Sequence, residues 1–126
     1  MNFMLWICQL SLGLLFTLSG TRKSVQSKAR MIETGQTGVR AYSLPFIRFI
    51  AAAELLGAIG LIVPWSIGIL SVLTPLASIG LAVIMVGAAR AHARQHEPRN
   101  VAANAVVLSL CLFVAVGRFG MLCKIL

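Results

Sequence analysis

Residues 44–63 read LPFIRFIAAAELLGAIGLIV, a continuous apolar stretch interrupted by one cation, Arg48, and one carboxylate, Glu54. At about 1.5 Å per residue, a stretch of this length crosses about 30 Å of hydrocarbon as an α-helix. The apolar residues do not alternate with polar ones, so the stretch lacks the pattern of a membrane β-strand. The sequence therefore predicts a transmembrane helix at residues 44–63.

Three further apolar stretches accompany this one, at residues 3–20, 67–88 and 101–122. Only residues 64–66 separate the second stretch from the third, and so short a connection favours antiparallel neighbours. The first stretch lacks the basic residues that begin a signal peptide, so we expect it to be retained. We predict an all-α integral membrane protein with one domain over residues 1–126, an up-down four-helix transmembrane bundle.

The composition agrees with a membrane protein. The chain has 126 residues, of which 59% are hydrophobic and 11% are charged. Soluble globular domains contain about 45–50% apolar and about 25% charged residues. Because a chain of this length has too little interior to bury so much apolar side chain, an ordinary soluble domain is excluded. The three scattered cysteines do not indicate a disulfide scaffold.

The charges predict an orientation in the membrane. The chain has eleven Lys and Arg residues but only three Glu residues, and most of the cations fall in residues 21–43 and 89–100. With four spans, these two basic loops lie on the same side of the membrane, and the positive-inside rule makes that side cytoplasmic. We therefore expect both termini outside. Because the cations lie between apolar stretches, we expect the lipid bilayer and not nucleic acid as their partner.

Glu54 is the candidate site residue with the strongest physical basis. It lies about 15 Å from the start of its predicted helix, near the bilayer midplane. An ionised carboxylate at that depth costs several kcal/mol unless it is paired, hydrated or protonated. Two interpretations follow and both stay open. Glu54 either binds a ligand or proton, or it forms a polar contact that fixes the register of the bundle.

Arg118 is the expected partner of Glu54. It lies near the end of the fourth stretch, and its Cα–Cβ bond should tilt back toward the depth of Glu54. We therefore predict a direct or water-mediated contact between these two side chains, with Gln9 as a neutral alternative. Arg48 lies close to the membrane surface, where its side chain can reach water. The candidate ligand- or proton-binding residues are thus Glu54, Arg118 and Gln9.

The remaining polar residues do not assemble a known catalytic motif. His92 and His96 are four residues apart, a spacing that can ligate a metal from one helix face, but no third ligand stands at a matching spacing. No serine–histidine pair with an acidic partner, glycine-rich phosphate loop or C-x-x-C motif is present. We expect no metal site and assign no catalytic residue, so the chain is more consistent with an accessory role than with an enzyme.

Two sequence blocks carry a family resemblance. Residues 54–64 read ELLGAIGLIVP, and residues 74–88 read TPLASIGLAVIMVGA. Their order and spacing resemble the DoxX-like family of small bacterial four-helix membrane proteins, and the resemblance extends over nearly the whole chain. By motif position, the residues that match the family pattern are Lys23, Glu54, His92 and Arg118. Ser24 departs from the pattern, because relatives often carry leucine there.

The resemblance implies a location and a function. It implies the bacterial inner membrane. The orientation predicted from the charges makes Lys23, Arg48 and His92 candidate residues at the cytoplasmic face. The resemblance also implies an accessory subunit of a quinone-linked membrane redox system, without an intrinsic cofactor but with quinone as the expected small molecule. The alternative is a small protein that binds or transports a solute or lipid around Glu54, and for this alternative we expect a homodimer. A purely structural assembly factor is the third hypothesis.

Overall fold

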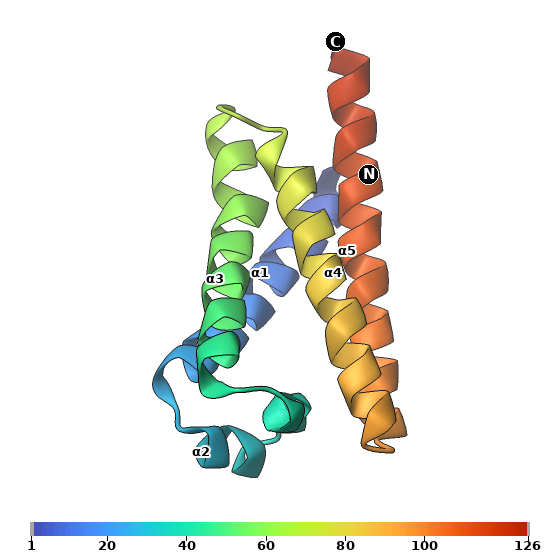
Figure 1. Ribbon diagram of the computed structural model, residues 1–126. Coiled ribbons are helices and arrows are strands. Elements are labelled where there is room, and N and C mark those ends of the chain that lie inside the picture. Colours follow the sequence, from blue (N-terminus) through green and yellow to red (C-terminus); the bar gives the residue numbers. More distant parts are fainter. Residues whose placement is uncertain (1, 126) are drawn as a thin grey trace.

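The computed structural model describes residues 2–125, so residues 1 and 126 of the predicted domain lie outside the described residues. The described chain is helical, and four of its helices are long and apolar enough to cross a membrane (Figure 1). The predicted all-α membrane bundle is therefore confirmed. The long helices are α1 (Asn2–Val25), α3 (Leu44–Ile67), α4 (Leu73–Arg94) and α5 (Pro98–Ile125).

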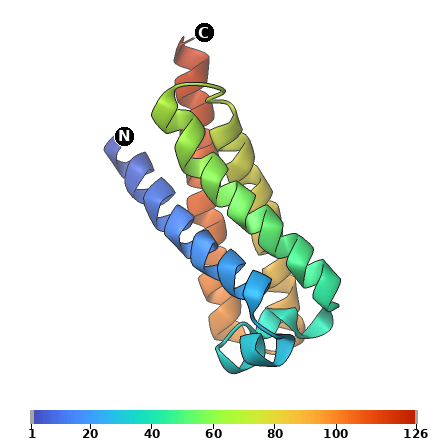
Figure 2. The same ribbon diagram turned by 90° about the vertical axis from the view of Figure 1, so that its left-hand side faces the viewer.

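Two short helices connect α1 to α3. They are α2 (Lys28–Glu33) and the 3-10 helix η1 (Thr37–Ala41), and they lie below the bundle in Figure 1. We call this end, with the turn between α4 and α5, the basic end. Both chain termini lie toward the opposite end, which we call the terminal end (Figure 2). Figure 2 also shows α1 running alongside α3, with which it forms one of the larger helix interfaces.

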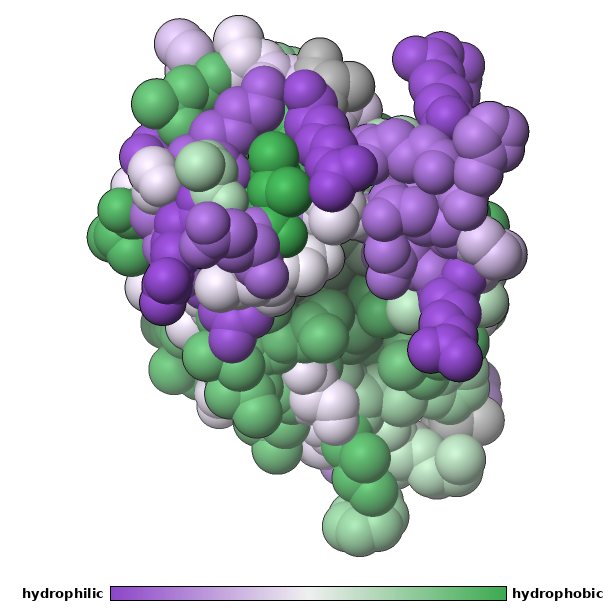
Figure 3. All heavy atoms as spheres, turned by 90° about the horizontal axis from the view of Figure 1, so that it is seen from below, coloured by the Kyte–Doolittle hydropathy of each residue, from purple (hydrophilic) through white to green (hydrophobic). Residues whose placement is uncertain are grey.

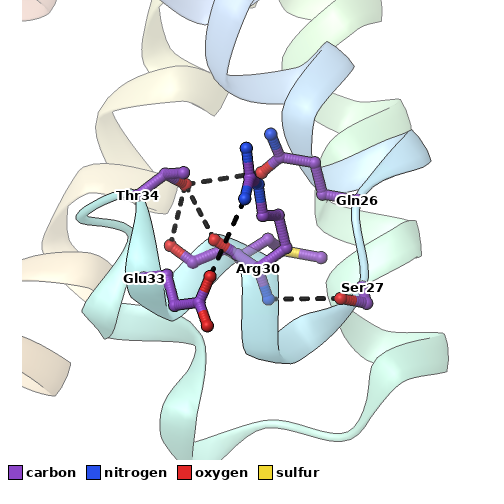
Figure 4. A network of polar contacts seen from close by, with 6 residues as sticks. Gln26, Ser27, Arg30, Glu33 and Thr34 are labelled. Carbon is purple, nitrogen blue, oxygen red and sulfur yellow. Dashed lines mark hydrogen bonds and ion pairs between the residues drawn. The ribbon is translucent and has the colours of Figure 1, made fainter.

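Local polar contacts define α2. Ser27 is its N-cap, with a side-chain oxygen that accepts a hydrogen bond from the Arg30 backbone N–H at 3.2 Å (Figure 4). This contact satisfies one of the free N–H groups of the first turn. Gly35 follows the helix with a φ of +101°, a left-handed conformation that glycine adopts without a Cβ penalty. These two residues explain why a helix of this length begins and ends here.

The hairpin between α3 and α4 lies later in the sequence than predicted. We expected residues 64–66 to form it, but α3 continues through Pro64 to Ile67. A proline inside a helix leaves the carbonyl four residues earlier without its N–H donor, here that of Gly60. The Thr74 hydroxyl donates to this Gly60 carbonyl at 2.9 Å, so the helix can continue. Gly68, at a φ of 72°, then ends α3, and α4 begins at Leu73 rather than at Ile67.

Small residues bring the helices close together. A Cβ at Gly20 would lie 2.8 Å from Leu55 Cγ and 3.1 Å from the Ala51 carbonyl oxygen, so α1 and α3 touch through this glycine. The Ser78 hydroxyl donates to the Cys111 carbonyl at 2.5 Å and joins α4 to α5. In a bilayer, close packing and interhelical hydrogen bonds of this kind drive helix association.

The outward faces of the bundle are apolar. Large hydrophobic side chains remain exposed on each long helix, and examples are Phe3, Leu56, Val83 and Val116. The interior is apolar as well, with a core that includes Phe16, Leu61, Leu81 and Val114. A protein that is hydrophobic both inside and outside is adapted to lipid rather than to water.

Candidate functional site

Glu54 is paired with Lys23. The Glu54 side chain is fully buried, and its Oε1 accepts a hydrogen bond from Lys23 Nζ at 2.5 Å, within an ion pair. Lys23 comes from the last turn of α1, and its side chain is 15% exposed. Arg48 Nη1 donates to the Lys23 backbone carbonyl, which holds the end of α1 against α3. The predicted contact between Glu54 and Arg118 is therefore wrong.

The direction of the side chains explains this correction. A Cα–Cβ bond tilts toward the N-terminus of its helix. In α3 this tilt points Glu54 toward the basic end, and in antiparallel α1 it points Lys23 toward Glu54. The sequence prediction ended the first span at Gly20 and left Lys23 in a loop, whereas α1 continues to Val25. The boundary of α1 thus decides which cation reaches Glu54.

Arg118 forms a separate polar cluster toward the terminal end. Its buried side chain donates from Nε to Gln9 Oε1 at 2.6 Å and from Nη1 to Asn2 Oδ1 at 2.7 Å. The guanidinium carbon lies 4.4 Å from the ring centre of Trp65 and 5.4 Å from that of Trp6. The aromatic faces attract the cation. Trp65 is eleven residues beyond Glu54 in α3, a distance of roughly 16 Å along the helix.

Gln9 serves this second cluster and not Glu54. Its Nε2 donates to the Leu61 carbonyl at 2.6 Å while its Oε1 accepts from Arg118. One amide of α1 therefore connects α3 and α5. The predicted role of Gln9 as a neutral partner of Glu54 is not what the structure shows. Both buried polar clusters instead join helices that are distant in the sequence.

A cavity of about 600 Å³ lies at the basic end. Its walls come from all four long helices and from residues 35–42, and most of them are apolar. Viewed from the basic end, green hydrophobic side chains are visible in the hollow between two purple hydrophilic groups (Figure 3). The lining contains no Asp or Glu among the described residues. Its polar members are Ser19, Arg22, Lys23, Gln36, Tyr42, His92, Asn100 and Asn104.

Two residues of this lining each carry a polar atom that has no hydrogen-bond partner among the described residues. These atoms are Gln36 Oε1, an acceptor, and Asn104 Nδ2, a donor, and both are buried. Gln36 Nε2 is already engaged with the Ser19 hydroxyl at 3.1 Å. A buried polar group without a partner costs about 1–3 kcal/mol, so a molecule that offers both an acceptor and a donor would be stabilised here.

Sequence reasoning did not identify these two amides. Asn104 could have been found, because it is a polar residue near the start of a predicted apolar span. Gln36 gave no such signal, since polar residues are common in loops. Only the position of residues 35–42 beneath the bundle brings Gln36 to the cavity. Glu54, by contrast, does not line the cavity, although its partner Lys23 does.

His92 belongs to a third polar cluster at the basic end. Its Nδ1 lies 3.0 Å from Glu97 Oε1. The Thr37 hydroxyl contacts both Glu97 oxygens, at 2.9 and 2.8 Å, and connects η1 to the turn between α4 and α5. The hydrogen bonds from His92 and then from Thr37 lower the pKa of Glu97 below its ordinary value of 4.5. Glu97 is therefore a carboxylate at neutral pH.

His92 and His96 were considered as metal ligands because they are four residues apart. Within residues 2–125, no group of three or more His, Cys, Asp or Glu side chains is arranged to hold a metal ion. His96, which is four residues after His92, has a φ of 59° in the turn after α4 and does not line the cavity. The two histidines therefore do not face one site.

Fold and site together define a four-helix membrane protein with a ligand-sized cavity at its basic end. Residues 7–114 match the DoxX-like family, and because this match covers most of the chain, the protein belongs to that family. The family resemblance of the sequence is thus confirmed. Gln9, Lys23, Glu54 and His92 lie within the matched residues, whereas Arg118 lies beyond them. No curated protein and no solved structure matches the chain.

Proposed function

We propose that this DoxX-like protein is an accessory subunit of a membrane redox system and that its cavity holds a quinone. The observation that carries this proposal is the pair of unpartnered amide atoms, Gln36 Oε1 and Asn104 Nδ2, on two residues that line an apolar cavity. A quinone carbonyl accepts a hydrogen bond from an amide N–H, and a hydroxyl of its reduced form donates to an amide oxygen. The cavity volume of about 600 Å³ lies within the usual range of about 300–1,000 Å³ for small-molecule sites.

The apolar and the polar side chains of the cavity have different roles in this proposal. The apolar walls exclude water, and the amides of Gln36 and Asn104 orient the polar head of the ligand. A quinone would supply the electron-carrying chemistry. The three free thiols, Cys8, Cys111 and Cys123, lie apart in α1 and α5, so we assign electron exchange to a partner protein.

Binding of a short-chain benzoquinone to the protein in lipid nanodiscs tests this proposal. We expect saturable binding and about a tenfold loss of affinity in Asn104→Leu and in Gln36→Leu, because each removes one hydrogen bond. Gln95→Leu is the matched control. The Gln95 amide atoms are also buried and unpartnered among the described residues, but Gln95 does not line the cavity. Absence of saturable binding, or an equal loss in Gln95→Leu, would overturn the proposal.

Native mass spectrometry of the gently solubilised protein separates the alternatives. A bound quinone-like mass that disappears in Asn104→Leu supports the redox role. A bound lipid or solute would support the carrier alternative, for which the apolar cavity wall is the favouring observation. The same spectra count protomers and so test the homodimer.

We further propose that the protein lies in the bacterial inner membrane with its basic end in the cytoplasm and its termini outside. All Lys and Arg residues except Arg118 and Lys124 lie toward the basic end. The positive-inside rule supports this orientation. A reporter fused after the C-terminus should be active only when it is of the type that requires export. Activity of a cytoplasmic reporter at that position would reverse the orientation.

A further inference from the structure

His92 lines the cavity, and one of its ring nitrogens is hydrogen-bonded to Glu97. It lies in the last turn of α4 and has a side chain that is 12% exposed. Its Nδ1 faces Glu97 Oε1 at 3.0 Å. Its Nε2 makes no hydrogen bond among the described residues, so this nitrogen is free to contact a molecule in the cavity.

Glu97 and Thr37 hold the imidazole in place. The Thr37 hydroxyl bridges both carboxylate oxygens, which fixes the orientation of the carboxylate. Of the two tautomers of a neutral imidazole, a carboxylate against Nδ1 favours the one that carries its hydrogen on Nδ1 and leaves a lone pair on Nε2. Thr37 follows Gln36 directly in the chain, so the same segment positions two polar groups of the cavity.

Cationic side chains share this end of the bundle with His92. Lys23 and Arg22 also line the cavity, and the charge of Lys23 is balanced by Glu54. Arg40 contributes to the positive potential at Glu97. His92 Nε2 and Gln36 Oε1 are two acceptors without a partner among the described residues, and both residues line the cavity. Asn104 Nδ2 and the side chains of Arg22 and Asn100 are the donors of the same lining.

We propose that His92 Nε2 accepts a hydrogen bond from a hydroxyl of the bound head group, so that the cavity prefers a hydroxyl-bearing quinol over the corresponding quinone. Glu97 and Thr37 are positioning residues for this contact. The inference rests on the proposed function, because it concerns the same cavity and the same class of ligand. A head group with two hydroxyls matches the two acceptors, whereas one with two carbonyls leaves both of them without a donor.

The test compares the affinities of a short-chain benzoquinol, kept under anaerobic conditions, and the corresponding benzoquinone for the protein in nanodiscs. We expect the wild-type protein to bind the quinol about tenfold more tightly, as one buried hydrogen bond predicts. His92→Phe should remove this preference by weakening the quinol alone. Glu97→Gln should reduce the preference without removing quinone binding, because the tautomer of His92 is no longer fixed. A merely structural role of Glu97 would weaken both ligands equally.

His96→Asn is the control, because asparagine tolerates the left-handed backbone of that position. It should leave both affinities unchanged. If neither ligand binds the wild-type protein, the proposed function fails. If both bind with equal affinity, or if His92→Phe weakens both equally, the inference about His92 fails while quinone binding stands. Thr37→Val provides a second variant, with a smaller loss of preference, should His92→Phe not fold.

Discussion

Lys23 Nζ lies 2.5 Å from Glu54 Oε1 and joins the last turn of α1 to the middle of α3. Glu54 is the only acidic residue in the four long helices. A buried carboxylate is tolerated in a membrane only when a cation or donor compensates it, so this contact is a condition for the observed packing. It ties the two helices together beside the cavity, which Lys23 also lines.

Replacing Lys23 should destabilise the protein more than replacing Glu54. Lys23→Met leaves a fully buried carboxylate without its cation and should cost about 3–5 kcal/mol of the free energy of unfolding. Glu54→Gln should cost less, because Lys23 is partly exposed and can reach the surface. The double variant should be more stable than Lys23→Met alone. Chemical unfolding in detergent measures all three.

The exposed pair of Arg30 and Glu33 supplies the control. Its closest N–O distance is 3.8 Å and both side chains are largely exposed (Figure 4). Glu33→Gln should change the free energy of unfolding by no more than about 0.5 kcal/mol. Strictly additive effects of Lys23→Met and Glu54→Gln would show that the two side chains do not interact.

Arg118 should be irreplaceable by lysine. Lysine keeps the charge but cannot donate to Gln9 and Asn2 from one planar group, so Arg118→Lys should cost about 2 kcal/mol. Both tryptophans of the chain flank Arg118, and the intrinsic emission therefore reports on this cluster. We expect a shift of that emission in Arg118→Lys and none in Lys124→Met, which alters an exposed cation. An unchanged spectrum and stability in Arg118→Lys would contradict the assigned contacts.

The contact between Thr37 and Glu97 should depend on pH. Because the folded protein holds the pKa of Glu97 below 4.5, the stabilisation is fully present above that value and is lost as the pH falls through the folded-state pKa. The melting temperature of the wild-type protein should therefore exceed that of Glu97→Gln at pH 7, and the two should converge as the pH falls below the folded-state pKa of Glu97. A difference that stays constant across this range would show that the charge of Glu97 is not involved.

Gly20 and Gly80 should respond differently to alanine. Gly20→Ala places a Cβ 2.8 Å from Leu55 Cγ and 3.1 Å from the Ala51 carbonyl oxygen, so it should separate α1 from α3 and cost about 1–3 kcal/mol. A Cβ at Gly80 meets nothing within 4 Å. Gly80→Ala should be neutral or stabilise the protein by up to about 1 kcal/mol, because alanine has the higher helix propensity. Equal thermal unfolding of the two variants would refute the close contact at Gly20.

The spans could be predicted because a continuous apolar stretch is a local property of the chain. Their ends could not be, since each depends on a contact made elsewhere. Pro64 was assigned to the connection between two spans, but the hydroxyl of Thr74, from the next helix, satisfies the carbonyl that the proline leaves free, and α3 continues to Ile67. Lys23 was assigned to a loop, but it completes the last turn of α1 and reaches Glu54.

The membrane class, the four apolar spans, the family, the accumulation of cations at one end and the need of Glu54 for a partner all follow from the amino-acid sequence. The three-dimensional fold was needed to show that this partner is Lys23 and that Arg118 contacts Gln9 and the tryptophans. It was also needed to show that Gln36, His92 and Asn104 line one cavity. Hydrophobic length and charge are read along a single segment. The pairing of side chains depends instead on the rotation and axial register of helices, which close packing between distant segments sets.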